Sequence, residues 1–376
     1  MSISRAIRVA AVMVAALLSM SHSPLPAQER ASGKPAGDST RLPADFETQR
    51  VLLLGWDKVD PPVQQVVLSV AKSVVDRIPA VILVPSEKER SIALKRGLEA
   101  EIPADRLRVA TVPINTCWVR DFAPIAVEKG PGLFRLMDPD YIADTRRDDD
   151  AVARPLGSLL GLPVENLPLI LEGGNVLSNG RGLLVTTSKL ADENTARDLD
   201  RKKLETMLRS AFGARQVVYL EPLVGEMTGH VDMFVTFPTA DTIVVASSTK
   251  NVDRINTEIL ERNAAQLEAV SIDGKLLRVV RVSMPPRVFE VWRSYTNVIF
   301  ANGVVLIPKY ANVDDSGHAA AVAVYRELLP KWSTVSIDCE PLARIGGALR
   351  CVSATYAGVK TLPQAMKPSE PAPRSP

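Results

Sequence analysis

Histidine and cysteine are both scarce in this chain of 376 residues, which contains three of each. One histidine lies near the N-terminus, so histidine chemistry in the folded body falls to His230 or to His318, which we expect on the surface at a helix start. Two histidines and the separated residues Cys117, Cys339 and Cys351 do not match the ligand spacing of a zinc site. We therefore expect no metal. One thiol stays free even if Cys117 and Cys339 form a disulfide, which the sequence leaves open.

The chain also lacks a strong excess of either charge. Its 45 Lys and Arg residues face 43 Asp and Glu residues, and aromatic residues make up only 5%. Without a basic stripe and interleaved aromatic residues, we do not expect a nucleic-acid partner. We find no glycine-rich phosphate loop, so we expect no nucleotide cofactor. The 46% hydrophobic content is enough for a sizeable core and predicts a folded globular protein.

The apolar run near the N-terminus is short. Arg5 and Arg8 precede an apolar stretch at 9–20, and small residues and prolines follow as far as Ala27. This order is typical of a secretory signal peptide. A run of about a dozen apolar residues falls short of the roughly 20 that span a bilayer. We therefore expect residues 1–27 to be cleaved, the protein to be periplasmic or secreted, and no stable membrane insertion after cleavage.

The rest of the chain divides into a folded body and two polar ends. Residues 28–41 predict a disordered linker and residues 363–376 a disordered proline-rich tail. Within the domain at 42–362, two apolar strands, an amphipathic helix and a third strand recur about every 50–65 residues, which indicates a repeat architecture. We expect 51–56 to pair near 349–353, so that the two ends complete a fifth module. The clearest hairpins lie at 175–186, 233–246 and 297–308, and the clearest helices at 63–78, 192–212, 252–268 and 316–329.

Polar residues recur at the junction between the third strand of one module and the next hairpin. Asp121, Glu172 and Cys351 each occupy such a junction, and His230 and Asp232 share another, two residues apart on one face. Singly, each has a structural interpretation as an ion pair, a turn cap, a strand-entry hydrogen bond or a small buried hydrophobic group. In a ring of modules the junctions converge. Carboxylates, an imidazole and a thiol would then form one site.

Six motifs, each weak alone, resemble in their order and spacing the family of agmatine deiminases and bacterial, Porphyromonas-type peptidyl-arginine deiminases. They are LPADFETQ at 42–49, WVRD at 118–121, EGGN at 172–175, GHVD at 229–232, SYTN at 294–297 and GGALRC at 346–351. The resemblance implies an α/β fold, the five-bladed α/β propeller called a pentein, with pseudo-fivefold ββαβ modules. This agrees with the module count.

The resemblance also implies roles for individual residues. It implies three catalytic residues: Cys351 is the nucleophile, His230 is the general acid and base, and Glu172 is the carboxylate partner of His230. It also implies that Asp121, Asp232 and Trp118 bind the substrate. Carboxylates pair with the edges of a planar guanidinium, and a thiolate attacks its carbon. Ala123 stands where the family often has Gly. Arg350 stands where agmatine deiminases usually have His, which leaves the substrate open.

We therefore expect a metal-free hydrolase that converts a guanidinium to a ureido group and ammonia through a cysteine thiouronium. Agmatine ranks first as substrate, with a role in putrescine biosynthesis, and peptidyl-arginine ranks second. The alternatives are an amidinotransferase, a cysteine peptidase and a non-catalytic propeller that only binds ligands. We expect selectivity to come from rim loops, notably the acidic stretch at 138–150 and Arg350, which could favour a carboxylate-bearing ligand.

Overall fold

A computed structural model describes residues 40–141 and 145–366, which belong to one compact unit. The predicted signal peptide at 1–27, residues 28–39 of the predicted linker and residues 367–376 of the predicted tail lie outside these ranges. None of the helices in the described part of the chain combines the length and apolar character needed to cross a membrane.

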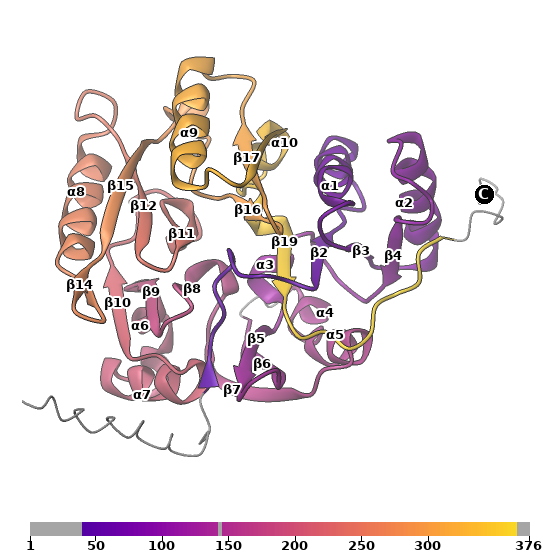
Figure 1. The fold of residues 1–376 in the computed structure, drawn as a ribbon, viewed down its shortest axis with the longest axis horizontal. Coiled ribbons are helices and arrows are strands. Elements are labelled where there is room, and N and C mark those ends of the chain that lie inside the picture. Colours follow the sequence, from indigo (N-terminus) through magenta and orange to yellow (C-terminus); the bar gives the residue numbers. More distant parts are fainter. Residues whose placement is uncertain (1–39, 142–144, 367–376) are drawn as a thin grey trace, which may run out of the picture. The chain divides into compact units, whose positions relative to one another are not determined.

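Strands and helices alternate along the described residues (Figure 1). The strands are β1 (Thr40–Arg41), β2 (Val51–Gly55), β3 (Ala80–Val84), β4 (Arg108–Thr111), β5 (Ile125–Lys129), β6 (Phe134–Asp140), β7 (Val164–Ile170), β8 (Leu177–Ser178), β9 (Leu183–Thr187), β10 (Gln216–Leu220), β11 (Val235–Thr239), β12 (Thr242–Ser247), β13 (Ser271–Ile272), β14 (Lys275–Leu276), β15 (Arg278–Ser283), β16 (Ile299–Phe300), β17 (Val304–Lys309), β18 (Ser333–Asp338) and β19 (Ser353–Tyr356). The helices are α1 (Pro61–Val74), α2 (Glu87–Glu99), α3 (Val119–Phe122), α4 (Arg147–Asp150), α5 (Ala153–Leu160), α6 (Lys189–Asn194), α7 (Arg201–Phe212), α8 (Arg254–Glu268), α9 (Asp315–Leu328) and α10 (Glu340–Arg344).

The fold is mixed α/β, and its larger sheets share one construction. Their strand orders are β19-β2-β3-β4, β1-β5-β6-β7, β10-β9-β8, β11-β12-β15 and β16-β17-β18. In each of these sheets an antiparallel pair is followed, across at least one helix, by a parallel strand. The strands β13 and β14 form a separate two-stranded ribbon. The predicted order of hairpin, helix and third strand therefore recurs five times.

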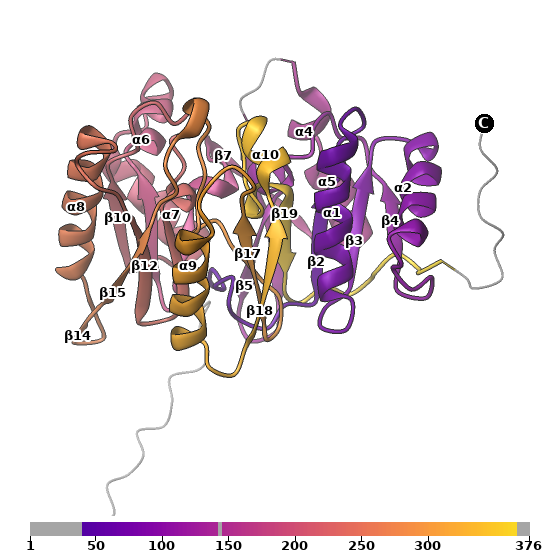
Figure 2. The ribbon, with the colours of Figure 1, turned by 90° about the horizontal axis from the view of Figure 1, so that it is seen from above.

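Strand β19 joins the two ends of the described chain. It runs antiparallel to β2, with Ser353 opposite Leu54 and Tyr356 opposite Val51. The predicted pairing of the chain ends is present, although the C-terminal strand begins at Ser353 rather than at 349. In Figure 1 the short helix α3 and strand β19 lie near the middle of the unit, while α1, α2, α8 and α9 lie towards its outside. Figure 2 shows α1, α8 and α9 standing roughly parallel to the strands.

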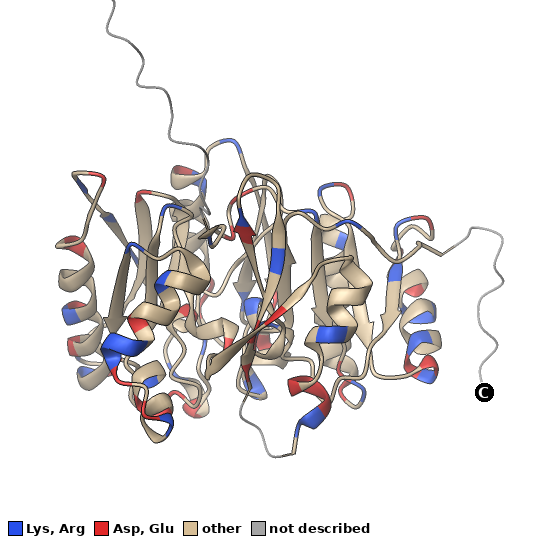
Figure 3. Ribbon diagram, turned by 90° about the horizontal axis from the view of Figure 1, so that it is seen from below, with Lys and Arg blue, Asp and Glu red and all other residues tan. Residues whose placement is uncertain are grey.

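Helix α1 illustrates how local sequence determines an element. Asp60 caps its N-terminus by accepting a hydrogen bond from Val63 N at 3.1 Å, and prolines, which fit a first helical turn, occupy 61–62. Val63, Val67, Val70 and Val74 follow helical spacing and are fully buried in the largest apolar cluster. Burial of each such side chain contributes about 1.5–3 kcal/mol. On the outer helices Lys, Arg, Asp and Glu are interspersed (Figure 3).

Three sequence predictions differ from the structure. The helix predicted at 192–212 is divided into α6 and α7, because Asp198 adopts a left-handed conformation with φ of 56° and Asp200 caps a new helix. Ordered structure begins before 42, since Thr40 and Arg41 pair with β5. It also extends beyond 362, because Met366 is buried and its N–H donates to Leu107 O at 3.1 Å.

Candidate active site

Short helical turns hold the predicted site residues near the centre of the unit. Asp121 lies in α3, Glu172 precedes the turn at Gly173–Asn175, and His230 precedes the turn at Val231–Met233 that contains Asp232. Cys351 lies in the turn at Arg350–Val352. Helix α3 contacts the turns at 173–175 and 350–352, and the turn at 173–175 contacts the one at 231–233. The strand-to-hairpin junctions therefore do converge.

His230 is buried between two carboxylates. Its Nε2 lies 2.5 Å from Glu172 Oε2, and its Nδ1 lies 3.6 Å from Asp121 Oδ1. Burial favours the neutral imidazole, but the negative charges of Asp121 and Glu172 outweigh it and raise the pKa of His230 to about 9. His230 is therefore protonated at neutral pH. Burial also disfavours the Glu172 carboxylate, yet its hydrogen bond to His230 keeps the pKa of Glu172 below its ordinary value.

Gly174 makes this approach sterically feasible. A Cβ at residue 174 would lie 2.4 Å from His230 Nδ1 and 2.8 Å from Asp121 Oδ1. Both distances are too short for non-bonded atoms, so any larger residue would separate the imidazole from the carboxylate. The second glycine of the EGGN motif, Gly174, is therefore required by the packing of the site.

Asp121 and Asp232 each contain a buried carboxylate oxygen. Within the described part of the chain, Oδ1 of each has no hydrogen-bond partner. Burial is the main cause that raises the pKa of Asp121 to about 7. The negative charges of Glu172 and Asp232 also raise it, while the positive charge of His230 lowers it. An unsatisfied buried carboxylate oxygen costs about 1–3 kcal/mol or more. These two oxygens are suited to bind a cation with N–H donors.

Cys351 is a buried thiol beside an amide. Asn297 Nδ2 lies 3.7 Å from its Sγ, and the backbone N–H of Ala348 donates to Sγ at 3.4 Å. Burial raises the pKa of the Cys351 thiol well above its ordinary value, and the charges of Asp232 and Asp121 raise it further. Cys351 is therefore a neutral thiol in this environment.

Asn297 is a site residue whose role we did not predict. Its Oδ1 accepts a hydrogen bond from Arg350 N at 2.7 Å, so it fixes the backbone next to the nucleophile. The SYTN motif contained the signal, because it stands at the junction before the hairpin β16–β17. The same positional rule that selected Asp121, Glu172 and His230 applied to Asn297.

The prediction that Arg350 is a rim residue is wrong. Arg350 is buried, and its Nε and Nη1 donate to Asp45 Oδ2 and Asp232 Oδ2, each at 2.8 Å. Burial opposes its charge, but the two carboxylates raise the pKa of Arg350 above its ordinary value. Asp232, predicted as a guanidinium ligand, therefore already holds an internal guanidinium with one oxygen. Asp45 is a second residue that sequence reasoning missed.

Trp118 is half-buried beside the nucleophile loop. A Cβ at Gly347 would lie 2.3 Å from its ring, so the indole packs directly on this loop. Trp118, Ile345, Asp57 and Asp60 line a pocket of about 270 Å³. This places an indole and two carboxylates next to the turn that leads to Cys351.

Two carboxylates of the acidic stretch at 138–150, Asp140 and Asp149, have structural contacts. Asp149 is buried, and it accepts hydrogen bonds from Asn115 N at 2.7 Å and from Thr116 Oγ1 at 2.9 Å. Asp140 pairs with Arg197. Asp144, which we counted in this cluster, lies outside the described residues. Asp149 therefore holds the loop before Trp118 and does not face a ligand.

The remaining thiols and histidine are parts of the core. Cys117, Cys339 and Cys351 are free thiols, so Cys117 and Cys339 do not form a disulfide. His318, predicted on the surface, is buried and contacts Pro308 O at 3.1 Å and Ser336 Oγ at 2.8 Å. Across residues 40–141 and 145–366 we find no group of three His, Cys, Asp or Glu side chains arranged to hold a metal ion.

Comparison with known proteins agrees with this arrangement. The agmatine deiminase structure of Enterococcus faecalis has a TM-score of 0.74 at 20% identity, covering 87% of this chain and 99% of that one. For the C. jejuni agmatine deiminase structure the TM-score is 0.72 at 19% identity, with 88% and 99% covered. These identities establish the fold alone. The chain therefore has the mixed α/β fold of agmatine deiminases.

The sequence comparisons establish the family. Residues 41–356 match the Porphyromonas-type peptidyl-arginine deiminases, and the chain belongs to this family. The agmatine deiminase of Ectopseudomonas mendocina is 24% identical over 362 residues, which cover 85% of this chain and 96% of that protein.

Proposed function

We propose that the protein hydrolyses a guanidinium group to a ureido group and ammonia, with Cys351 as the nucleophile. The observation that carries this proposal is the pair of buried carboxylate oxygens of Asp121 and Asp232 that accept no hydrogen bond, beside a thiol and a protonated imidazole. Two carboxylates match the edges of a planar cation. They suit a neutral amide poorly, which disfavours a cysteine peptidase.

The proton balance of the site fits attack by a thiol. A guanidinium bound between Asp121 and Asp232 neutralises the two carboxylates that raise the pKa of Cys351. The thiol then releases its proton to solvent more readily, and Sγ forms a bond to the guanidinium carbon. His230, which is protonated at neutral pH, donates a proton to the departing nitrogen as the C–N bond breaks and ammonia leaves.

The second half of the reaction uses the same imidazole in its neutral form. His230 removes a proton from a water molecule, whose oxygen attacks the carbon of the thiouronium. The C–S bond breaks, the hydroxyl proton of the adduct passes to the Cys351 thiolate as the ureido carbonyl forms, and the product leaves. Glu172, hydrogen-bonded to Nε2 at 2.5 Å, keeps the ring in position through both steps. Every atom of the products comes from the guanidinium and one water.

Agmatine is the substrate that we rank first. The pocket beside Trp118 contains Asp57 and Asp60, two carboxylates that can attract the distal ammonium of agmatine. This supports a short substrate with a cation at each end. Family membership and the named relatives support the same reaction class.

Peptidyl-arginine is a second candidate, favoured by a different observation. Met227 is 78% exposed and its Cε would lie 2.7 Å from a Cβ at Gly346, so an uncovered apolar side chain flanks the nucleophile loop. Ile345 next to it is 39% exposed. A peptide backbone could cover these groups, whereas agmatine is too small to do so.

Ammonia release and ureido product should be measured with agmatine, free arginine and an internal-arginine peptide at equal concentrations. We expect the largest kcat/KM for agmatine without any added amine. A larger value for the peptide reverses the ranking, and a requirement for an acceptor amine indicates an amidinotransferase. If no substrate is turned over, a binding-only protein replaces the proposal.

Architecture and location complete the proposal. We interpret the five larger sheets as five blades of a propeller around the axis near α3, with the catalytic domain at 42–362 extended by a few residues at each end. We also propose export after cleavage near Ala27, supported by Arg5, Arg8 and the short apolar run that follows them. N-terminal sequencing of the protein from a periplasmic fraction tests this, and an intact Met1 in the cytoplasmic fraction contradicts it.

A further inference from the structure

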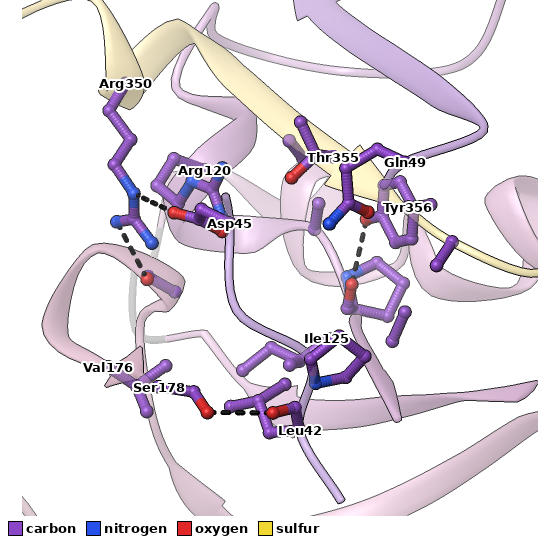
Figure 4. A pocket seen from close by; sticks show the side chains of 17 residues that line it. Leu42, Asp45, Gln49, Arg120, Ile125, Val176, Ser178, Arg350, Thr355 and Tyr356 are labelled. Carbon is purple, nitrogen blue, oxygen red and sulfur yellow. Dashed lines mark hydrogen bonds and ion pairs between the residues drawn. The ribbon is translucent and has the colours of Figure 1, made fainter. Parts of the chain in front are cut away.

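A second polar pocket lies beside the candidate active site (Figure 4). Its volume is about 60 Å³, and its lining includes both Arg120 and Arg350. Figure 4 shows the two guanidinium groups close to Asp45, with Leu42, Ile125 and Val176 on other parts of the wall. None of Asp121, Glu172, His230, Asp232 or Cys351 lines this pocket.

Arg120 has almost no counter-charge in this pocket. Its side chain is 12% exposed, and it makes no hydrogen bond to another described residue. The nearest carboxylate oxygen, Asp45 Oδ1, is 4.0 Å from Nη1. Asp45 already accepts a hydrogen bond from Arg350 at 2.8 Å. A largely buried cation without a hydrogen-bonded carboxylate is electrostatically unfavourable and would be stabilised by an added anion.

Arg350 does not relieve this imbalance. Its second carboxylate partner, Asp232, lies on the side of the active site. Burial and the positive charge of Arg350 lower the pKa of Arg120, and the negative charges of Asp45 and Asp232 oppose this shift without reversing it. The lining of the pocket therefore contains two cations and one carboxylate, and Asp232, the second carboxylate near them, is not part of this lining.

The shape and lining of the pocket narrow the class of anion. A guanidinium binds a carboxylate through parallel N–H donors. Leu42, Ile125 and Val176 supply apolar wall for a short hydrocarbon tail, and a volume of about 60 Å³ admits only a small molecule. We propose that this pocket binds a short-chain monocarboxylate, with the carboxylate on Arg120 and the alkyl tail towards Ile125.

The proposal is tested by titrating the full chain with propionate, using propionamide as the neutral isostere and sodium chloride to keep ionic strength constant. Calorimetric titration and thermal unfolding should both detect saturable binding of propionate and none of propionamide. Because a hydrogen bond to a charged group is worth about 1.5–3 kcal/mol, Arg120→Gln should weaken propionate binding by about tenfold or more.

Two further variants make the test independent of folding defects. Arg215→Gln removes an exposed arginine paired with Asp273 and should leave propionate binding unchanged. Ile125→Phe fills the pocket without changing charge and should weaken binding even if Arg120→Gln is unstable. The absence of saturable propionate binding to the wild-type protein, or equal binding by Arg120→Gln, overturns the proposal. These readouts do not depend on catalysis.

Discussion

The candidate active site and the neighbouring pocket are built from adjacent residues but carry opposite charge. Asp121 faces His230, whereas Arg120 faces the pocket; Cys351 lies beside Asn297, whereas Arg350 lines the pocket. One side gathers carboxylates around an imidazole, and the other gathers guanidinium groups around one carboxylate. The same two short turns therefore supply groups of both kinds.

This division means that the two regions stabilise each other. Arg350 donates to Asp45 on the pocket side and to Asp232 on the active-site side, so one buried cation connects both. Removing the reacting thiol of Cys351 should lower the rate of catalysis and leave the fold intact. Removing the connecting cation of Arg350 should mainly lower the stability of the fold. The substitutions below separate these outcomes.

The largest effect is expected for Cys351→Ala. Loss of the attacking thiol should lower kcat/KM for ammonia release by about 10⁴-fold or more, because the reaction has no other nucleophile. The thermal midpoint should change little, since alanine fits the space. Cys117→Ala is the matched control: it removes a buried thiol outside the site and should retain activity. Wild-type turnover by Cys351→Ala contradicts the mechanism.

Arg350→Met should have the next largest effect, on stability. It leaves the buried Asp232 and the half-buried Asp45 without their cation, so the free energy of unfolding should fall by about 3–5 kcal/mol. Denaturant titration measures this change. Arg262→Met, which breaks an exposed pair with Glu221, should reduce the same quantity by no more than about 1 kcal/mol. Equal losses for the two variants would remove the distinction between a connecting cation and a surface pair.

The convergence of the site could be predicted from the sequence because a repeat constrains where its junctions meet. Asp121, Glu172, His230 and Asp232 were found by their place at those junctions. The contacts of Arg350 could not be found in this way, because its partners are 118 and 305 residues distant along the chain. Whether a cation faces solvent or a buried carboxylate depends on rotamer and packing, which hydrophobic periodicity does not encode.

The dependence of kcat/KM on pH should be bell-shaped in the wild-type protein. Below about pH 7 Asp121 gains a proton and can no longer bind the guanidinium as an anion, so the acidic limb falls there. Above about pH 9 His230 loses the proton that it donates to ammonia, so the basic limb falls there.

Glu172→Gln should move both limbs to lower pH. The substitution removes a negative charge that raises the pKa of His230 and also that of Asp121, while Asp121 and Asp232 still act on the imidazole. The maximum rate should also fall, by about 10²-fold, because the imidazole loses the partner that orients it. Initial rates measured from pH 5 to pH 11 would test this. A basic limb that stays near pH 9 contradicts the pairing of Glu172 with His230.

Lys189→Met should produce the smallest effect, in the opposite direction. Lys189 Nζ lies 3.3 Å from Glu172 Oε2, the oxygen that also contacts His230. The same Nζ lies 3.1 Å from Glu193 Oε1, so the ammonium is shared between two carboxylates. Removing this ammonium leaves Glu172 to interact with the imidazolium alone, so the pKa of His230 should rise and the basic limb should move to higher pH. Its side chain is 26% exposed and its ion pairs are screened by solvent, so the change should correspond to less than about 1 kcal/mol. Methionine keeps the apolar stem that lies against Gly229, so the turn before His230 should be preserved. A basic limb that moves to lower pH would mean that Lys189 supports the imidazolium through the backbone of this turn and does not compete for Glu172.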